Sequence, residues 1–325
     1  MFENVPYNND AIVESLEYHT ADGHIYRFDD GRNRFTLGVS GLGLPDIEFV
    51  DQIARHGRDL LSWRANERTV QFGITHKAGT HARYWRNRQR LLNHIRPNRN
   101  YGIQYASGRL VIKYLIEDDD GYEAHETRCL DAAITRGPNF DARNTDDWQE
   151  NTYTETLRFL SNGYPFWYAP QEQVVQFDNT LANTNLDFSS QFSVDWVFDS
   201  DTAQASNRIV YNGTVPSYPI IELHGPMLGA TITNVTTGKS IEFGYSISQG
   251  EVVYINLKPG NKSVSTISGL NLIGSIGSLS SFATFAIEPD PQALGGINDI
   301  EITMPQSVDG ETKAVIRYYE YYIGI

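Results

Sequence analysis

The chain has 325 residues, of which 40% are hydrophobic and 20% charged, which excludes an intrinsically disordered protein and suffices for two folded domains. Its single cysteine, Cys129, excludes an internal disulfide and a cysteine metal site, so we predict a buried, unreactive thiol. The formal net charge of −14 is uneven: residues 1–136 hold 18 Lys and Arg against 19 Asp and Glu, whereas residues 137–325 hold 8 against 21.

The N-terminus, residues 1–6, lacks the basic and apolar segments of a signal peptide, and no run of about eighteen apolar residues follows anywhere in the chain. The sequence therefore predicts a protein that is made and folded in a cytosol, without export or membrane insertion.

Most of the chain alternates apolar and polar residues between turn residues, a pattern typical of β-strands. Aromatic residues, at 12%, also favour strands. The clearest strand candidates are residues 69–74, 109–116, 191–198, 251–257 and 314–323. Because strands and helices do not alternate, antiparallel sandwiches are favoured over a parallel α/β sheet. We therefore predict a mainly β fold of two β-sandwich domains.

Residues 80–95 predict one amphipathic helix in the first domain. Thr80 can cap its N-terminus, and Pro97 follows its end. At about 100° per residue, the helix gathers two sets of side chains on opposite sides: apolar Tyr84, Trp85, Leu91, Leu92 and Ile95, and basic Arg83, Arg86 and Arg90. Arg88 projects within the apolar side, so we expect its guanidinium to reach water or to meet a carboxylate.

The same helix lies in a basic stretch, because no acidic residue occurs between Glu67 and Glu117 while ten Lys and Arg do. Clustered arginines bind nucleic-acid phosphates. They are also favoured at protein interfaces, where they pair with carboxylates such as those of the other half of the chain. The overall pI near 5.0 favours the interface. The candidate subunit-interface residues are Arg83, Arg86, Arg88 and Arg90.

Residues 137–147 are polar and have the composition of a linker or long loop. We therefore predict a first β domain over residues 1–136, a linker over 137–150 and a second β-sandwich over 151–325. The last strand of the second domain could pack back on the first.

Several short motifs resemble parts of ligand-binding or metal-binding sites, but turns and strand geometry explain them better. Residues 237–240 resemble the end of a phosphate-binding loop but lack its first glycine, which predicts a hairpin turn. Acidic residues 118–120 lack the remainder of a calcium loop and predict a turn. The histidine pairs His19 with His24 and His76 with His81 are spaced to point to opposite faces of a strand. We predict no catalytic residue, cofactor or metal.

Several segments, taken in order, resemble the distal tail protein family of siphophages. Residues 41–47, Gly-Leu-Gly-Leu-Pro-Asp-Ile, are similar to a glycine-leucine-proline segment of that family. The strand at 68–72 and the helix-to-proline segment at 91–97 follow it. Residues 162–168, Asn-Gly-Tyr-Pro-Phe-Trp-Tyr, are similar to its proline-aromatic segment. The order of segments 212–221, 232–239 and 250–255 is similar to the family's galectin-like second domain. The acidic stretch at 118–126 and the linker at 137–147 are additions.

This resemblance implies a structural virion protein of the tail tip or baseplate, and not an enzyme. The first domain would close a homohexameric ring that continues the channel of the tail tube, and the galectin-like domains would project outward. The implied partners are other copies of the chain, the tail tube protein, a tip hub protein and receptor-binding proteins. DNA would meet the protein only in transit through the channel. The family offers no catalytic residues to transfer.

The alternative function is a carbohydrate-binding module. Its sugar-stacking surface would be the aromatic cluster of Tyr164, Phe166, Trp167 and Tyr168, which could equally be a core cluster beside a turn. A third hypothesis, an enzyme that degrades the host cell surface, requires converging carboxylates from distant parts of the chain, which leave no signature in a sequence.

Overall fold

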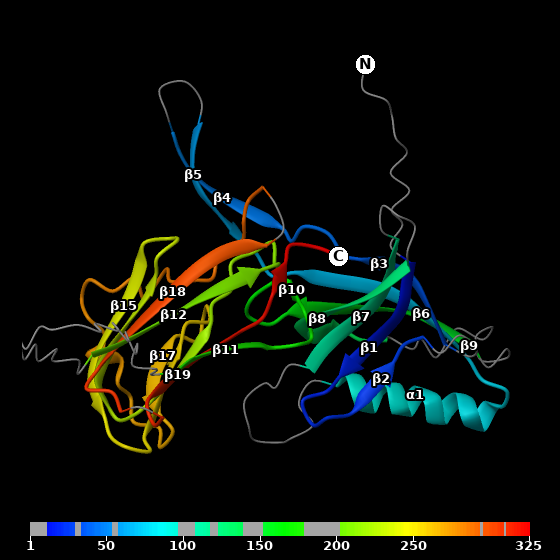
Figure 1. Ribbon diagram of the computed structural model, residues 1–325. Coiled ribbons are helices and arrows are strands. Elements are labelled where there is room, and N and C mark those ends of the chain that lie inside the picture. Colours follow the sequence, from blue (N-terminus) through cyan, green and yellow to red (C-terminus); the bar gives the residue numbers. More distant parts are fainter. Residues whose placement is uncertain are drawn as a thin grey trace, which may run out of the picture. The chain divides into compact units, whose positions relative to one another are not determined.

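The computed structural model describes residues 12–29, 34–53, 58–96, 108–117, 123–138, 152–178, 202–292, 295–308 and 310–325. The described part is mainly β with a single α-helix, which confirms the predicted fold class and the predicted helix (Figure 1). The strand expected at 191–198 and the turn expected at 118–120 lie outside the described residues. The chain forms two compact units, residues 1–170 together with 322–325, and residues 171–321.

The first unit is built on one antiparallel sheet with the strand order β2-β1-β7-β8-β9-β6-β3. The strands are β1 (Ile12–His19), β2 (Ile25–Arg27), β3 (Arg34–Ser40), β6 (Thr69–Lys77), β7 (Gly108–Glu117), β8 (Glu123–Arg136) and β9 (Thr152–Ser161). Alternation sets the sheet's inner face: in β6, Val70, Phe72 and Ile74 are buried while Gln71 is exposed. A short strand, β10 (Trp167–Tyr168), pairs with β8.

Helix α1 (His81–Ile95) begins where the sequence predicts it. The Oγ1 of Thr80 accepts a hydrogen bond from the backbone N–H of Arg83 at 3.3 Å, which caps the first turn. Tyr84, Leu91 and Ile95 are buried in the same core as the inner face of the sheet.

Trp85 departs from the predicted apolar side of α1, because 46% of its surface is exposed. Its indole Nε1–H donates to Nε2 of His81 at 2.8 Å, so the ring lies along the helix surface instead of entering the core. Leu92, also expected on that side, is half-buried.

The first unit extends to residue 170, beyond the predicted linker at 137–150, most of which lies outside the described residues. The reason is that β9 is paired with β6 along its length, from the pair of Thr69 and Leu160 to the pair of Lys77 and Thr152. It is also paired with the end of β8. The chain re-enters this unit at Tyr322, within the short strand β20 (Tyr321–Tyr322). Its last residue donates from the Ile325 N–H to the carbonyl of Leu42 at 3.0 Å.

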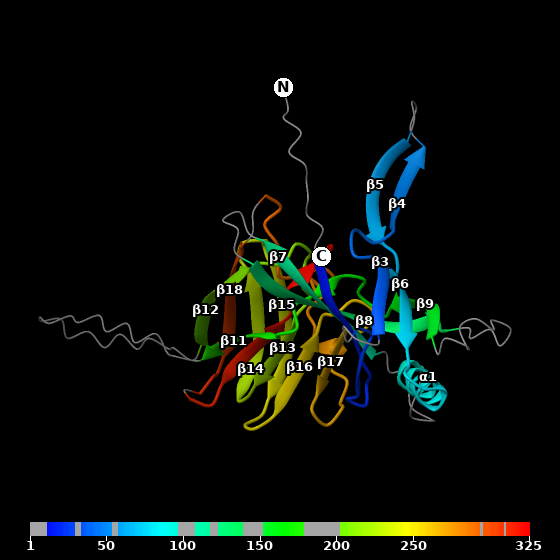
Figure 2. The same cartoon turned by 90° about the vertical axis from the view of Figure 1, so that its right-hand side faces the viewer.

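The second unit is a two-layer β-sandwich (Figure 2). One sheet has the order β11-β19-β13-β16-β17, with β11 (Gln173–Asp178), β13 (Ile220–His224), β16 (Val252–Asn256), β17 (Ser263–Thr266) and β19 (Lys313–Tyr318). The other has the order β12-β18-β14-β15, with β12 (Thr202–Tyr211), β14 (Met227–Asn234), β15 (Lys239–Ile247) and β18 (Gly296–Pro305). Fully buried residues of both sheets, such as Ile255 and Ile302, share one core.

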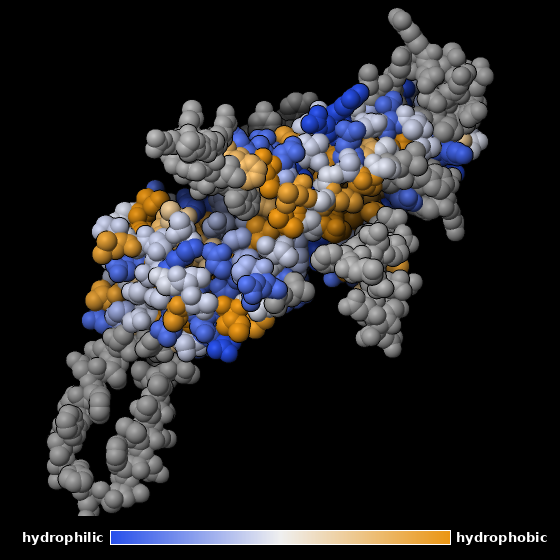
Figure 3. Space-filling model, turned by 90° about the horizontal axis from the view of Figure 1, so that it is seen from above, coloured by the Kyte–Doolittle hydropathy of each residue, from blue (hydrophilic) through white to orange (hydrophobic). Residues whose placement is uncertain are grey.

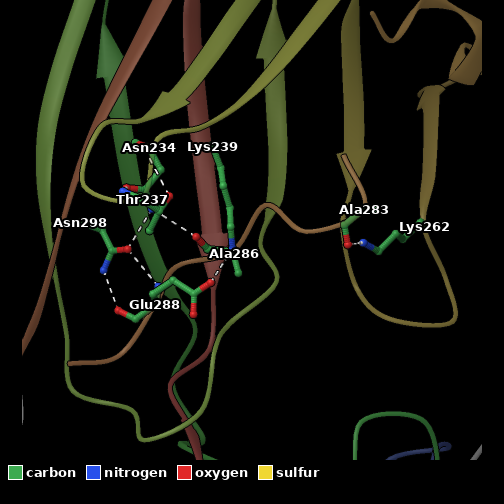
Figure 4. A network of polar contacts seen from close by, with 8 residues as sticks. All are labelled: Asn234, Thr237, Lys239, Lys262, Ala283, Ala286, Glu288 and Asn298. Atoms are coloured by element: carbon green, nitrogen blue, oxygen red, sulfur yellow. Dashed lines mark hydrogen bonds and ion pairs between the residues drawn. The ribbon is translucent and has the colours of Figure 1, made fainter. Parts of the chain in front are cut away.

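A polar network lies at one end of this sandwich (Figure 4). The buried amide of Asn234 donates from Nδ2 to Oδ1 of Asn298 at 2.9 Å, and Asn298 donates to the carbonyl of Glu288 at 2.9 Å. The Nζ of Lys239 lies 2.8 Å from Oε1 of Glu288. The 237–240 motif, which opens β15, is therefore part of a hairpin turn with Gly238 at a φ of +68°, as predicted.

Cys129 is buried within β8, as predicted, and burial raises the pKa of its thiol to about 11. At pH 8 only about one thousandth of such thiols are ionised, and the thiolate is the reactive form. We therefore expect a colorimetric thiol reagent to leave the native protein unmodified at pH 8 and to react with one thiol per chain in denaturant. Rapid reaction of the native chain would contradict the burial of Cys129.

Candidate functional site

Arg68 joins distant segments of the first unit. The residue is only 1% exposed, and its guanidinium donates hydrogen bonds to four backbone carbonyls. Nε donates to the carbonyl of Pro165 at 2.7 Å, and Nη2 donates to that of Ile323 at 2.6 Å. Nη1 donates to the carbonyl of Gly41 at 2.8 Å and also to that of Gly43. One side chain therefore fixes the 41–43 loop, the 165 turn and the C-terminal segment.

The surroundings of Arg68 suit a buried cation. The Cζ atom lies 5.7 Å from the ring centroid of Trp167, and the backbone N–H donates to Oγ of Ser161 at 2.8 Å. Burial lowers the pKa of Arg68 to about 10, so the guanidinium remains charged at neutral pH. The carbonyl dipoles replace the water that burial removes.

The loop that receives Arg68 requires glycine at position 41. Gly41 has a φ of +87°, in the left-handed region, and a Cβ added there would lie 2.0 Å from the carbonyl oxygen of Thr69. The glycine-leucine-proline segment at 41–47 and the proline-aromatic segment at 162–168 therefore meet at one arginine.

In the sequence analysis, Arg68 is counted among the residues of the basic stretch and is not predicted to join three segments of the first unit. The sequence does contain a signal for the burial of Arg68. Arg68 lies two residues before Val70 and four before Phe72, and every second residue of β6 at these positions is buried. Strand alternation therefore puts Arg68 on the inner face of the sheet, where an arginine needs dedicated partners.

The aromatic cluster belongs to the core, which is one of its two predicted alternatives. Phe166, Trp167 and Tyr168 are buried, and Tyr164 is half-buried with its ring centroid 4.8 Å from that of Phe166. The hydroxyl of Tyr168 donates to Oδ1 of Asp131 at 2.7 Å. The buried rings of Phe166, Trp167 and Tyr168 hold the 162–168 segment against β8, and Tyr164 is the member of the cluster that remains partly exposed.

Three of the four candidate interface arginines are exposed on α1. Arg83, Arg86 and Arg90 have exposed side chains, whereas Arg88 is half-buried. The Cζ of Arg88 lies 4.8 Å from the ring centroid of Trp85, a cation–π contact that the sequence analysis does not predict. The structure brings all four arginines onto one surface helix, which we call the arginine helix.

A hairpin forms the second exposed feature of the first unit. Strands β4 (Ile47–Ile53) and β5 (Arg58–Ala65) pair with each other in a separate two-stranded sheet, and both views show it extending away from the main sheet (Figures 1 and 2). Near its base, Nε of Arg64 donates to Oε2 of Glu48 at 2.8 Å, and Phe49 is 56% exposed.

The open grooves lined by described residues include one in each unit. The larger, of about 650 Å³, lies at the base of the hairpin and mixes acidic with basic side chains: Asp46, Arg64, Glu67 and Arg158. The smaller, of about 320 Å³, lies in the second unit and includes His224, Glu251 and Glu311. Within the described residues, no group of three or more His, Cys, Asp or Glu is placed to hold a metal ion. No described helix is long and apolar enough to cross a membrane.

Comparisons with known proteins identify the fold. No protein-family model matches the chain, and no curated protein matches it. The crystal structure of SPP1 Dit, described as a hub of the adsorption apparatus in phages that infect Gram-positive bacteria, matches with a TM-score of 0.53 and 12% identity. The match covers 94% of this chain and 97% of that one. A chain of the phage P2 baseplate in its activated conformation matches with a TM-score of 0.41 and 12% identity, over 91% of this chain and 98% of that one. The resemblance read from the sequence is thus confirmed at the level of fold: the chain has the fold of a phage Dit protein.

Proposed function

We propose that this chain is a distal tail protein, a structural hub of a phage tail that connects the tail tube to the tip or baseplate. The observation that carries the proposal is the extent of the match to SPP1 Dit, which spans nearly the whole of both chains. The meeting of the 41–47 and 162–168 segments at Arg68 supports it from within the chain. The chain is then a virion tail component and not an enzyme.

The first unit is the part that we propose to close a homohexameric ring. An isolated two-stranded hairpin is only marginally stable in water. The β4–β5 hairpin has Phe49 and the adjoining Leu44 more than half exposed, so contact with a neighbouring copy would stabilise it. The arginine helix offers a second contact, because its exposed basic face complements acidic protein surfaces.

The second unit is the part that we propose to face other tail components. It holds 16 Asp and Glu against 6 Lys and Arg, a net charge of −10. Its proposed galectin-like sandwich would project from the ring towards receptor-binding proteins, while the ring contacts the tube protein and a tip hub protein. DNA would only pass through the channel. The aromatic cluster gives the alternative carbohydrate-binding function little support, because Phe166, Trp167 and Tyr168 are buried.

Labelling of phage particles tests the proposed location. Antibody fragments raised against the purified chain should mark a single site in electron micrographs, at the distal end of the tail tube. An antibody against the capsid protein serves as the control. Labelling spread along the tube or confined to the head would contradict a hub at the tip.

A further inference from the structure

Residues 267–279, which we call the apolar segment, close one side of the sandwich in the second unit. The segment follows β17 and contains the short 3-10 helix η1 (Ile273–Ser275), which contacts both β17 and β15. A bridge between Phe243 and Ile276 ties it to β15, and the N–H of Gly277 donates to the carbonyl of Glu242 at 2.8 Å. The apolar segment is therefore held to the edges of both sheets.

Apolar side chains point from this segment both inward and outward. Leu272 is buried, and Ile276 packs against the core. Four others are exposed: Ile267 by 75%, Leu270 by 54%, Ile273 by 46% and Leu279 by 88%. Single exposed apolar residues are ordinary, and Figure 3 shows several on one face of the molecule. Four in one short, well-anchored segment are not needed by the fold, because the inward residues already supply its core contacts.

Charged residues are also missing from this stretch of the sequence. Residues 263–287 contain no Asp, Glu, Lys or Arg, although 20% of the whole chain is charged. The centres of protein interfaces are depleted of charge in the same way, because each buried charge would have to be desolvated. The rest of the unit is strongly acidic, with Glu242 next to the segment.

We propose that the apolar segment is a docking surface for a different protein, whose contacting face has an apolar centre and a basic rim. The net charge of −10 on the unit makes a second copy of this chain an unfavourable occupant, because two units that each carry this charge would repel each other. The same charge attracts a basic rim. That the occupant is another tail protein rests on the proposed function.

Labelling of an introduced cysteine tests this surface. The native thiol of Cys129 will not compete for the reagent, because it is buried and its pKa is raised to about 11. The test variants are Leu279→Cys and Ile267→Cys. The matched control is Val210→Cys, because Val210 is 53% exposed and lies on β12, at the opposite side of the sandwich where β11 and β12 contact each other. Thermal unfolding of each variant should match the wild type, since all three positions are exposed.

The experiment compares maleimide labelling of the free chain with labelling of the assemblies that carry the chain in infected cells. Labelling at positions 279 and 267 should fall about tenfold or more in the assemblies, as expected of an interface that excludes water, while labelling at position 210 should not fall. A thiol-to-amine cross-linker placed at position 279 should join the chain to lysines of a different protein, identified by mass spectrometry.

Two outcomes would overturn the docking surface: unchanged labelling at 279 and 267 in every assembly, or a cross-link from 279 to a second copy of the chain. Absence of the chain from tails would overturn the proposed function instead. The docking surface would then be tested by the same labelling in whichever assembly contains the chain. The two failures are therefore distinguishable.

Discussion

Replacing Arg68 with alanine is expected to lower the free energy of unfolding of the first unit by about 3–5 kcal/mol. The substitution leaves four backbone carbonyls without their donor, including those of Pro165, Gly41 and Ile323. It also opens a cavity at a site that is 1% exposed. Thermal and denaturant unfolding of the full chain would measure the loss, and limited proteolysis would show the released C-terminal segment.

Two further variants separate this role from a general effect of charge. Arg68→Lys should be nearly as destabilising as Arg68→Ala, because one ammonium cannot reach carbonyls arranged around a planar guanidinium. Arg64→Ala is the matched control, since its side chain is 68% exposed in an ion pair with Glu48 and should cost no more than about 0.5 kcal/mol. Equal stability of Arg68→Ala and Arg64→Ala would contradict the account of Arg68.

Replacing Arg83, Arg86 and Arg90 together with glutamate is expected to weaken self-assembly by about tenfold to a hundredfold while leaving the subunit folded. All three side chains are exposed, so the core residues of α1 keep their contacts. Charge reversal turns attraction to carboxylates of a neighbouring subunit into repulsion. Sedimentation over a range of protein concentrations would measure the change.

The matched control for this triple variant is the replacement of the same three residues with lysine. Lysine keeps the positive charge, so assembly should remain closer to that of the wild type, and circular dichroism should be the same for both variants. If the glutamate variant assembles like the wild type, the arginine helix is not a subunit contact.

Local features of this fold could be predicted from sequence because they depend on neighbouring residues. Alternation placed β6, β7 and β16 correctly, and the Thr80 cap placed the start of α1. The prediction of the apolar side of α1 is less accurate, because Trp85 makes a surface hydrogen bond to His81 that periodicity does not reveal.

Features that depend on distant residues were not accessible in the same way. The extent of the first unit is decided by the pairing of β9 with β6, between strands that are far apart in the sequence. The composition of residues 137–147 marks a polar segment and not the end of the sheet. The partners of Arg68 likewise come from three separate segments, although strand parity could have shown that the side chain points inward.

The resemblance to distal tail proteins rested on short segments, and the structure gives two of them a physical reason. Residues 41–47 and 162–168 supply carbonyls to the same guanidinium, so Arg68 ties the backbones of the two segments together, and the φ of Gly41 requires a glycine there. The arginine helix has no such internal constraint on its exposed side. Its function therefore has to be measured in the assembly.

The most direct test of a ring-forming hub is the absolute mass of the purified full chain, measured by light scattering at low and high salt. The account predicts a species six times the subunit mass of 36.7 kDa, or a concentration-dependent equilibrium that approaches it. High salt should shift that equilibrium towards the monomer, because salt screens exposed charge pairs. A mass of 36.7 kDa at every protein concentration and at both salt concentrations would contradict the proposed ring.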